Sequence, residues 1–172
     1  CDHGWDIDLD DGSSNYHIYN NLCLHGGLKL REGFARTVEN NIMVNNTFHP
    51  HVWFANSQDI FRHNIVTTPY RPIQVKEWGK ETDTNFFVTK QGLEQAQKRG
   101  TDLHSLYGDP LFIAPEKGDY RVKENSPALK TGFRNFDMEH FGVQCPHLKA
   151  LAATPELPVF KIPEEKPETV QT

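Results

Sequence analysis

Apolar and polar residues alternate in short stretches along the first half of the chain, a pattern typical of half-buried strands. Ile7 and Leu9 alternate with acidic residues, and Leu28 and Leu30 alternate with a basic one. Side chains of a strand point to opposite faces in turn, so we expect these apolar residues inside and their polar neighbours outside. In the next two stretches the same alternation predicts the inward residues Val52, Phe54, Ile73 and Val75.

The alternating stretches recur at an interval of about 21 residues, and an asparagine leads the second strand of each unit. These asparagines are Asn21, Asn41, Asn64 and Asn85, which lie 20, 23 and 21 residues apart. Units this short cannot bury an apolar face alone, so they must stack into a solenoid. Because stacked strands lie about 4.8 Å apart, we expect the asparagines to form a hydrogen-bonded structural ladder.

Two parts of the chain resemble the right-handed parallel β-helix proteins of the pectate-lyase-like superfamily, many of which act on polysaccharides. The first is the set of four coils within residues 4–88. The second is GDPLFIAPEKGDYRVKENSPALKTG, residues 108–132, which resembles the closing segment of β-helical carbohydrate-active enzymes through its DPLF, GDYR and SPAL elements. An amphipathic segment at 90–99, ended by Gly100, is similar to a helical insertion in those relatives. The resemblance implies an all-β, right-handed parallel β-helix of about four coils with one short helix.

We expect residues 1–132 to form the C-terminal coils of such a domain. Residues 133–172 are rich in proline and lack periodicity, which predicts an extended tail, packed on the solenoid or loose in solvent. The chain begins within a repeat and without an initiator Met, so we expect the remaining N-terminal part of the same polypeptide as a partner. The resemblance implies a secreted or periplasmic protein.

Composition excludes several classes of function. The 172 residues carry a net charge of −5 with no run of Lys or Arg, which argues against a nucleic-acid or anionic-membrane partner. No apolar stretch is long enough for a membrane span. The cysteines Cys1, Cys23 and Cys145 lack metal-site spacing, and we expect Cys23 to be buried. With no phosphate loop, nucleophile elbow or HExxH motif, any chemistry depends on carboxylates.

The stretch DIDLDDGSSN, residues 6–15, concentrates four aspartates where alternation predicts a strand. Like charges this close raise one another's pKa, so such a stretch usually serves a site. We expect Asp8 and Asp10 on the outer face, next to Lys29 and Arg31 of the following coil. The predicted outward columns are Asp8, Lys29, Trp53 and Gln74, then Asp10, Arg31, Ala55 and Lys76, with Asp11, Glu32, Asn56 and Glu77 at the strand ends.

Asp10 and Glu32 are the first choice for a catalytic pair, since they lie one repeat apart, and Asp8 and Asp11 are close competitors. We expect Arg31 to hold Asp10 ionised while Glu32 keeps its proton. These stretches also resemble the catalytic region of β-helical glycoside hydrolases, including a β-xylosidase family. That resemblance implies Asp10 as nucleophile and Glu32 as acid/base of a glycoside hydrolase, of retaining type if the two carboxyls lie on adjacent coils.

Basic and aromatic residues near the carboxylates are typical of sugar-binding surfaces, because charged groups bind hydroxyls and Trp rings stack on pyranoses. The predicted substrate-binding residues are Lys29, Arg31, Trp53, Trp5, His51 and Lys76. The predicted substrate is a plant or microbial polysaccharide or oligosaccharide, and the hydrolytic reaction needs no cofactor.

Three alternatives remain open at this stage. A polysaccharide lyase would use the aspartates to hold Ca²⁺ against a uronate. A noncatalytic solenoid would bind carbohydrate without turnover. In the plainest interpretation, the aspartates pair with Lys29, Arg31 and Arg36 as a solvated lattice of salt bridges.

Overall fold

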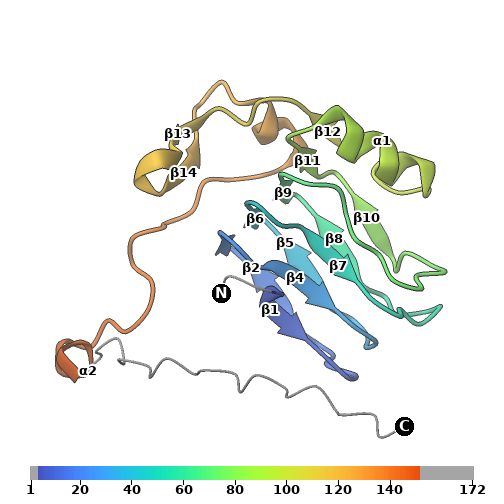
Figure 1. Ribbon diagram of the computed structural model, residues 1–172, viewed down its shortest axis with the longest axis horizontal. Coiled ribbons are helices and arrows are strands. Elements are labelled where there is room, and N and C mark those ends of the chain that lie inside the picture. Colours follow the sequence, from blue (N-terminus) through green and yellow to red (C-terminus); the bar gives the residue numbers. More distant parts are fainter. Residues whose placement is uncertain (1–3, 152–172) are drawn as a thin grey trace, which may run out of the picture. The chain divides into compact units, whose positions relative to one another are not determined.

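Three parallel β-sheets run through the repeat region, because each coil contributes short strands to successive sheets (Figure 1). The structure is a computed structural model that describes residues 4–151. The first sheet contains β1 (Trp5–Leu9), β4 (Gly27–Leu30) and β7 (Phe48–Pro50). The second contains β2 (His17–Tyr19), β5 (Thr37–Glu39), β8 (Ile60–Arg62) and β10 (Glu81–Asp83). The third contains β3 (Leu22–Cys23), β6 (Ile42–Met43), β9 (Ile65–Val66), β11 (Phe86–Phe87) and β12 (Leu106–Tyr107).

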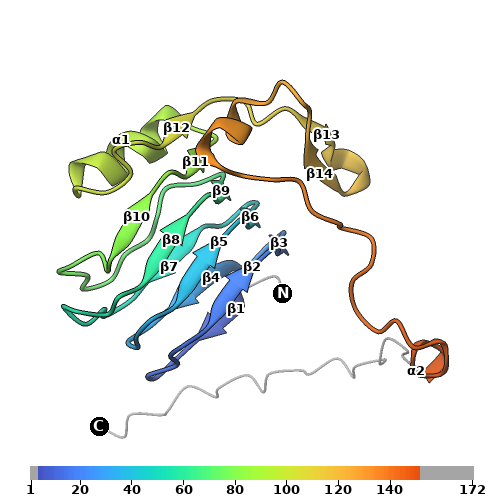
Figure 2. The same ribbon diagram turned by 180° about the vertical axis from the view of Figure 1, so that it is seen from behind.

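Every pairing within these three sheets is parallel, and successive strands of a sheet come from successive coils (Figure 2). The predicted fold class, a right-handed parallel β-helix, is confirmed. Stacking of this kind is required because strands of two to five residues bury little apolar surface by themselves.

The interior is filled by apolar side chains that stack from coil to coil. Leu28 of β4 lies opposite Phe48 of β7 and both are fully buried. Phe48 stacks on Phe61 of the second sheet with 3.9 Å between ring centres, and Tyr70 packs edge-on against both rings. Each fully buried side chain of this size contributes about 1.5–3 kcal/mol. Cys23 is buried, as predicted.

The asparagine ladder predicted from the repeat spacing is present at the corner between the second and third sheets. Each side-chain amide donates to the side-chain oxygen of the asparagine one coil on, from Asn21 to Asn41 at 2.9 Å, from Asn41 to Asn64 at 3.0 Å and from Asn64 to Asn85 at 3.1 Å. The same oxygens accept backbone N–H groups of the preceding coil. Asn41, Asn64 and Asn85 are fully buried, so this network satisfies polar groups that have no access to water.

A buried carboxyl group ends the ladder. Asp102 Oδ1 accepts hydrogen bonds from Asn85 at 2.9 Å, Ser105 at 2.7 Å and Tyr70 at 3.2 Å. Asp102 Oδ2 is buried and has no hydrogen-bond partner. Burial raises the pKa of Asp102 to about 6, although the hydrogen bonds oppose this shift.

The third and fourth coils differ from the predicted register. We expected Val52 and Phe54 inside, but the strand of the third coil is Phe48–Pro50, and Phe54 is exposed. Phe48, Pro50, Val52 and Phe54 share one alternation frame, so the run FHPHVWF allows an earlier or a later strand, and the structure uses the earlier one, which places Phe48 over Leu28. The positive φ of Val52, 51°, then breaks the alternation before Phe54. In the fourth coil Ile73 is exposed and joins the first sheet only through a bridge to His51, so its predicted burial is wrong, whereas Val75 packs against the core.

The segment after the coils forms the predicted helix and then covers the third sheet. Helix α1 (Lys90–Lys98) is capped by Thr89, whose side chain accepts from the Gly92 N–H. The closing segment makes an antiparallel hairpin of β13 (Phe112–Ala114) and β14 (Asp119–Val122), joined by η1 (Pro115–Lys117), and then η2 (Pro127–Thr131). Phe133 packs with Val122 against the outer side chains of β6, β9 and β11.

The chain divides into two units, Cys1–Met138 and Glu139–Thr172. The first unit extends six residues beyond the boundary at 132 that we placed from composition, because Phe133 is fully buried and Met138 packs against its cluster. The described part of the second unit contains α2 (Pro146–Leu151), whose residues are all exposed. The remainder of the predicted tail lies outside the described residues. Neither α1 nor α2 has the length and apolar character needed to cross a membrane.

Replacement of Asn64 by Ala removes a central link of the ladder and leaves the buried backbone N–H of Asn41 without its acceptor. We expect a loss of about 3 kcal/mol or more in the free energy of unfolding, measured by urea denaturation. Asn21→Ala at the half-buried first position should cost clearly less. Equal losses in the two variants would contradict the idea that burial makes the hydrogen bonds of Asn64 more important for stability than those of Asn21.

Asp102 makes stability depend on pH. Its folded pKa of about 6 lies above the ordinary 3.8, so the unfolded chain loses this proton first and stability falls as pH rises from about 4 to about 6. Asp102→Asn keeps the acceptor oxygen and removes the charge. We expect this variant to gain up to about 3 kcal/mol relative to the parent between about pH 4 and about pH 7. Glu124→Gln, at an exposed position, is the control and should give no such gain.

Candidate functional site

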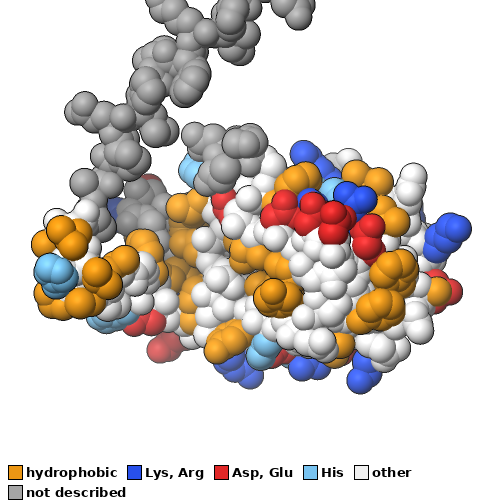
Figure 3. Space-filling model, turned by 90° about the horizontal axis from the view of Figure 1, so that it is seen from below, with side chains coloured by type: hydrophobic (Ala, Val, Ile, Leu, Met, Phe, Trp, Pro, Cys, Tyr) orange, Lys and Arg blue, Asp and Glu red, His pale blue; other side chains and the backbone are white. Residues whose placement is uncertain are grey.

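Acidic side chains of the first coil surround two cationic side chains of the second coil on the outer face of the first sheet. Figure 3 shows Asp and Glu side chains gathered at one edge of the molecule with Lys or Arg side chains directly beside them. The strand register explains this arrangement, because Asp8 lies opposite Lys29 and Leu9 opposite Leu30. The predicted outward direction of the first two coils is therefore confirmed for this pair, with Leu9 and Leu30 buried.

A turn after β1 brings further carboxylates to the same place. Asp11 and Gly12 both have positive φ angles, of 35° and 84°, and the N–H of Ser13 donates to the carbonyl of Asp10 at 3.1 Å. The Gly12 N–H donates to the carbonyl of Glu32 at 2.7 Å, which ties this turn to the end of β4. The structure thus brings Asp8, Asp10, Asp11 and Glu32 together, as expected from the repeat. We call these four residues with Lys29 and Arg31 the charged cluster.

Lys29 is the centre of one half of the charged cluster. It projects from the outer face of β4, yet only 5% of the residue is exposed. Its Nζ lies 2.8 Å from Asp8 Oδ1, 3.2 Å from Asp10 Oδ1 and 4.2 Å from the centre of the Trp5 ring. Burial alone would lower the pKa of Lys29, but the hydrogen bonds and charges of both aspartates raise it. Lys29 therefore stays charged and holds the two carboxylates against the sheet.

Arg31 is the centre of the other half. Its Nε lies 2.6 Å from Glu32 Oε2, 3.5 Å from Asp11 Oδ1 and 3.7 Å from Asp10 Oδ1. The hydrogen bond from Lys29 and the charges of both cations lower the pKa of Asp10. The pKa of Glu32 is also lowered, by a hydrogen bond to its own backbone and by Arg31. The expected division, with Asp10 ionised and Glu32 protonated, is therefore not found, because Arg31 binds Glu32 more closely than Asp10.

Two histidines extend the charged cluster onto the third coil. His49 of β7 lies opposite Lys29, and the rings of His49, His51 and Trp5 pack edge-on at 5.8–5.9 Å. Burial lowers the pKa of His49 to about 4, and burial together with the nearby cations lowers the pKa of His51, so both rings are neutral at neutral pH. Trp5 Nε1 and His51 Nε2 are buried without a hydrogen-bond partner in the described structure. Such atoms mark positions for an ordered water or a ligand.

Two predicted substrate-binding residues lie elsewhere. Trp53 was expected on the outer face, but it is buried in the core, where its Nε1 donates to the Leu30 carbonyl at 2.9 Å. A buried ring cannot stack on a sugar, so this prediction is wrong. Lys76 is exposed, but the fourth coil adds no strand to the first sheet, so Lys76 does not continue the column of Asp10 and Arg31.

Arg36 does not belong to the charged cluster, which corrects the plain interpretation that included it. Arg36 and Asp59 form a fully buried ion pair, with Nη2 and Oδ2 2.5 Å apart and Nε and Oδ1 3.0 Å apart. The guanidinium also donates to the carbonyl of Arg31. This pair supports the corner beneath the charged cluster, since it fixes the chain directly after Arg31.

A second polar group lies on the outer face of the second sheet and was missed in the sequence. Glu39 accepts from Arg62 at 2.9 Å and lies 2.9 Å from His17 Nε2, and Arg62 also contacts Glu81 at 3.3 Å. The signal was available, because His17 and Glu39 are 22 residues apart, the same spacing as Asp10 and Glu32.

Comparisons with family models, curated proteins and solved structures give no match. The assignment to β-helical glycoside hydrolases, and to a β-xylosidase family among them, therefore stays a prediction from the residues. Within residues 4–151, no three carboxylate, imidazole or thiol groups come together as a candidate metal site. In the charged cluster the carboxylates instead face the ammonium of Lys29 and the guanidinium of Arg31.

Replacement of Arg31 by Gln tests the electrostatics of the charged cluster without reference to activity. We expect the pKa of Glu32 to rise towards or above its ordinary value, and that of Asp10 to rise less, because Lys29 still binds Asp10. Titration of the carboxyl carbons by NMR measures both. Arg121→Gln, which removes the partner of Asp119, is the matched control. An unchanged Glu32 pKa in Arg31→Gln would contradict the proposed contact.

Proposed function

We propose that this chain is part of a glycoside hydrolase that acts on an oligosaccharide or polysaccharide with a pair of carboxyl groups. Asp10 is the proposed nucleophile and Glu32 the proposed acid/base, with Asp11 and Asp8 as the alternatives. We propose a carbohydrate substrate because of the β-helix fold together with the residues that resemble carbohydrate-active enzymes.

One observation carries the proposal. Oxygens of Asp10 and Glu32, from successive coils, lie within 3.7 Å of the same nitrogen of Arg31, so these oxygens cannot be more than twice that distance apart. Retaining glycosidases need carboxyl groups roughly 5 to 5.5 Å apart and inverting ones roughly 6.5 to 9.5 Å. The pair is therefore close enough for two-carboxylate chemistry, and the two residues follow the ends of the adjacent strands β1 and β4.

In a retaining reaction, protonated Glu32 gives its proton to the glycosidic oxygen as the bond to the anomeric carbon breaks. The ionised carboxylate of Asp10 forms an ester to that carbon. Glu32 then takes a proton from a water molecule, which attacks the same carbon and releases Asp10. The hydrogen bond from Lys29 lowers the pKa of Asp10, so Asp10 is ionised before it attacks and again after the ester is hydrolysed. Because a hydrogen bond from its own backbone and the contact with Arg31 lower the pKa of Glu32, the acid form requires low pH or a substrate that displaces these contacts.

A noncatalytic carbohydrate-binding solenoid is the second candidate, and one observation favours it. Both carboxylates of the proposed pair are ionised and ion-paired in the free protein, as in a surface that binds hydroxyl groups without proton transfer. The lyase alternative is less well supported, because Lys29 and Arg31 occupy the space between the carboxylates where a Ca²⁺ ion would have to bind.

Hydrolysis of aryl glycosides separates these candidates. We expect Asp10→Asn and Glu32→Gln each to reduce kcat by about 10³-fold or more, since each removes a group that forms or breaks a bond. A panel of aryl xylosides, arabinosides, glucosides and galactosides identifies the sugar. Glu116→Gln, an exposed acid in η1, is the control and should keep the parent rate.

Two outcomes would reject the hydrolase. One is unchanged hydrolysis in both variants, and the other is carbohydrate binding by the parent without turnover of any glycoside across the acidic and neutral pH range. Activity that disappears with a chelator and gives an unsaturated product would support the lyase instead.

A further inference from the structure

An exposed pair of aromatic rings lies beside the charged cluster. Phe34 and Phe54 stack with 5.0 Å between ring centres and 17° between ring planes. Each side chain is 42% exposed, so the pair forms an apolar patch in contact with water. Phe34 comes two residues after Glu32, and its N–H donates to Ser14 Oγ at 3.0 Å. The pair therefore stands where the chain leaves the first sheet and turns towards the second.

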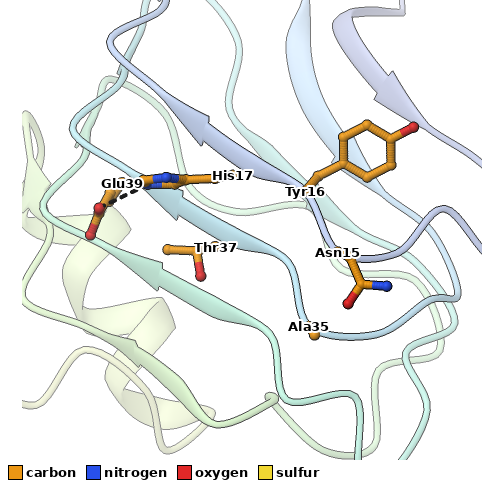
Figure 4. A pocket seen from close by; sticks show the side chains of 6 residues that line it. All are labelled: Asn15, Tyr16, His17, Ala35, Thr37 and Glu39. Carbon is orange, nitrogen blue, oxygen red and sulfur yellow. Dashed lines mark hydrogen bonds and ion pairs between the residues drawn. The ribbon is translucent and has the colours of Figure 1, made fainter.

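A hollow of about 390 Å³ opens on the other side of this corner. It is lined by Asn15, Tyr16, His17, Ala35, Thr37 and Glu39, which come from β2, β5 and the turns that precede them (Figure 4). A backbone hydrogen bond of 3.0 Å from the Asn15 N–H to the Phe34 carbonyl connects the hollow to the aromatic pair. The charged cluster, the aromatic pair and the hollow thus lie next to one another on the first three coils.

Two polar side chains of the hollow, His17 and Glu39, are held by contacts with neighbouring residues. Figure 4 shows His17 and Glu39 side by side on adjacent strands, with Thr37 next to them and Asn15 at the opposite end. Glu39 is fixed by Arg62, and the His17 ring packs on Tyr19 at 4.5 Å between centres. The hollow therefore presents an imidazole and a carboxylate held by these contacts, together with the Thr37 hydroxyl and the Asn15 amide, which is a mixture of donors and acceptors suited to sugar hydroxyls.

We infer that the aromatic pair and the hollow form a second binding region, which holds further sugar units of a neutral oligosaccharide whose cleaved end lies at the charged cluster. The position of the cleaved end rests on the proposed function, whereas binding of sugar at this region does not. Aromatic faces bind the C–H face of a pyranose, and the hollow supplies hydrogen bonds for the next unit.

The charge of the surface favours a neutral sugar. In the charged cluster four carboxylates face two cations, and in the hollow Glu39 is already paired with Arg62. Uronate units would bring additional negative charge to a surface without a free cation in these two regions, which costs free energy. The ligand class is therefore a neutral oligosaccharide longer than a disaccharide.

Calorimetry with disaccharides and hexasaccharides of xylose, glucose and arabinose, and with oligogalacturonate, tests the inference on the full chain. We expect the parent to bind one neutral hexasaccharide at least about tenfold more tightly than its disaccharide, a difference of about 1.4 kcal/mol. The double variant Phe34→Ala with Phe54→Ala, and separately Glu39→Gln, should reduce this ratio to near one. Tyr107→Ala, a half-exposed aromatic on β12, is the matched control and should keep it.

Three results would overturn the inference: no neutral hexasaccharide binds better than its disaccharide, both sets of variants keep the parent ratio, or oligogalacturonate binds most tightly. Urea denaturation of each variant confirms that it is folded. The two proposals fail separately, because loss of length-dependent binding without loss of turnover rejects only this one. Intact length-dependent binding with no turnover rejects only the hydrolase.

Discussion

The hydrogen-bonded column of asparagines fixes how each coil lies on the next. Each buried amide donates to one coil and accepts from the other, so a shift by one residue would break several bonds that water cannot replace. In a strand such a shift would also exchange the inward and outward faces. The column therefore determines which side chains form the core and which face solvent. It ends at Asp102, whose buried carboxyl completes the network but introduces a dependence of stability on pH.

The charged cluster follows from this register. With Leu28 and Leu30 directed inwards, Lys29 is directed outwards against Asp8 and Asp10, while Arg31 follows at the strand end. The corner beyond Arg31 is held by the buried pair of Arg36 and Asp59, so the end of β4 has little freedom to move. Breaking such a buried pair typically costs about 3–5 kcal/mol, because one charge stays in the interior without a partner. A rigid corner suits a site in which two carboxyl groups must keep a fixed separation.

Electrostatics and shape divide the outer surface into two complementary parts. In the charged cluster, the hydrogen bond from Lys29 lowers the pKa of Asp10, and a backbone hydrogen bond and Arg31 lower the pKa of Glu32. These shifts suit Asp10 as the proposed nucleophile, whereas Glu32 has to gain a proton before it can act as the proposed acid. Beyond Phe34 the surface changes to aromatic rings and a polar hollow in which Glu39 is paired with Arg62. A chain of sugar units that spans both parts would gain affinity from the second part and reactivity from the first.

By itself the sequence determined the solenoid, the ladder and the first two coils. The regular spacing of Asn21, Asn41, Asn64 and Asn85, and an alternation with one possible frame around Leu28, are local signals that any stacked repeat must obey. Only the tertiary structure decided the third coil, the partner of Arg36 and the charge of Glu32. The run FHPHVWF allows two strand positions within one frame, and packing of Phe48 on Leu28 and Phe61 selects the earlier one. After that strand the chain turns at Val52, and Trp53 is buried. Ion pairing depends on distances between side chains, and a difference of about 1 Å, as between the two carboxylates bound to Arg31, is not encoded in repeat spacing.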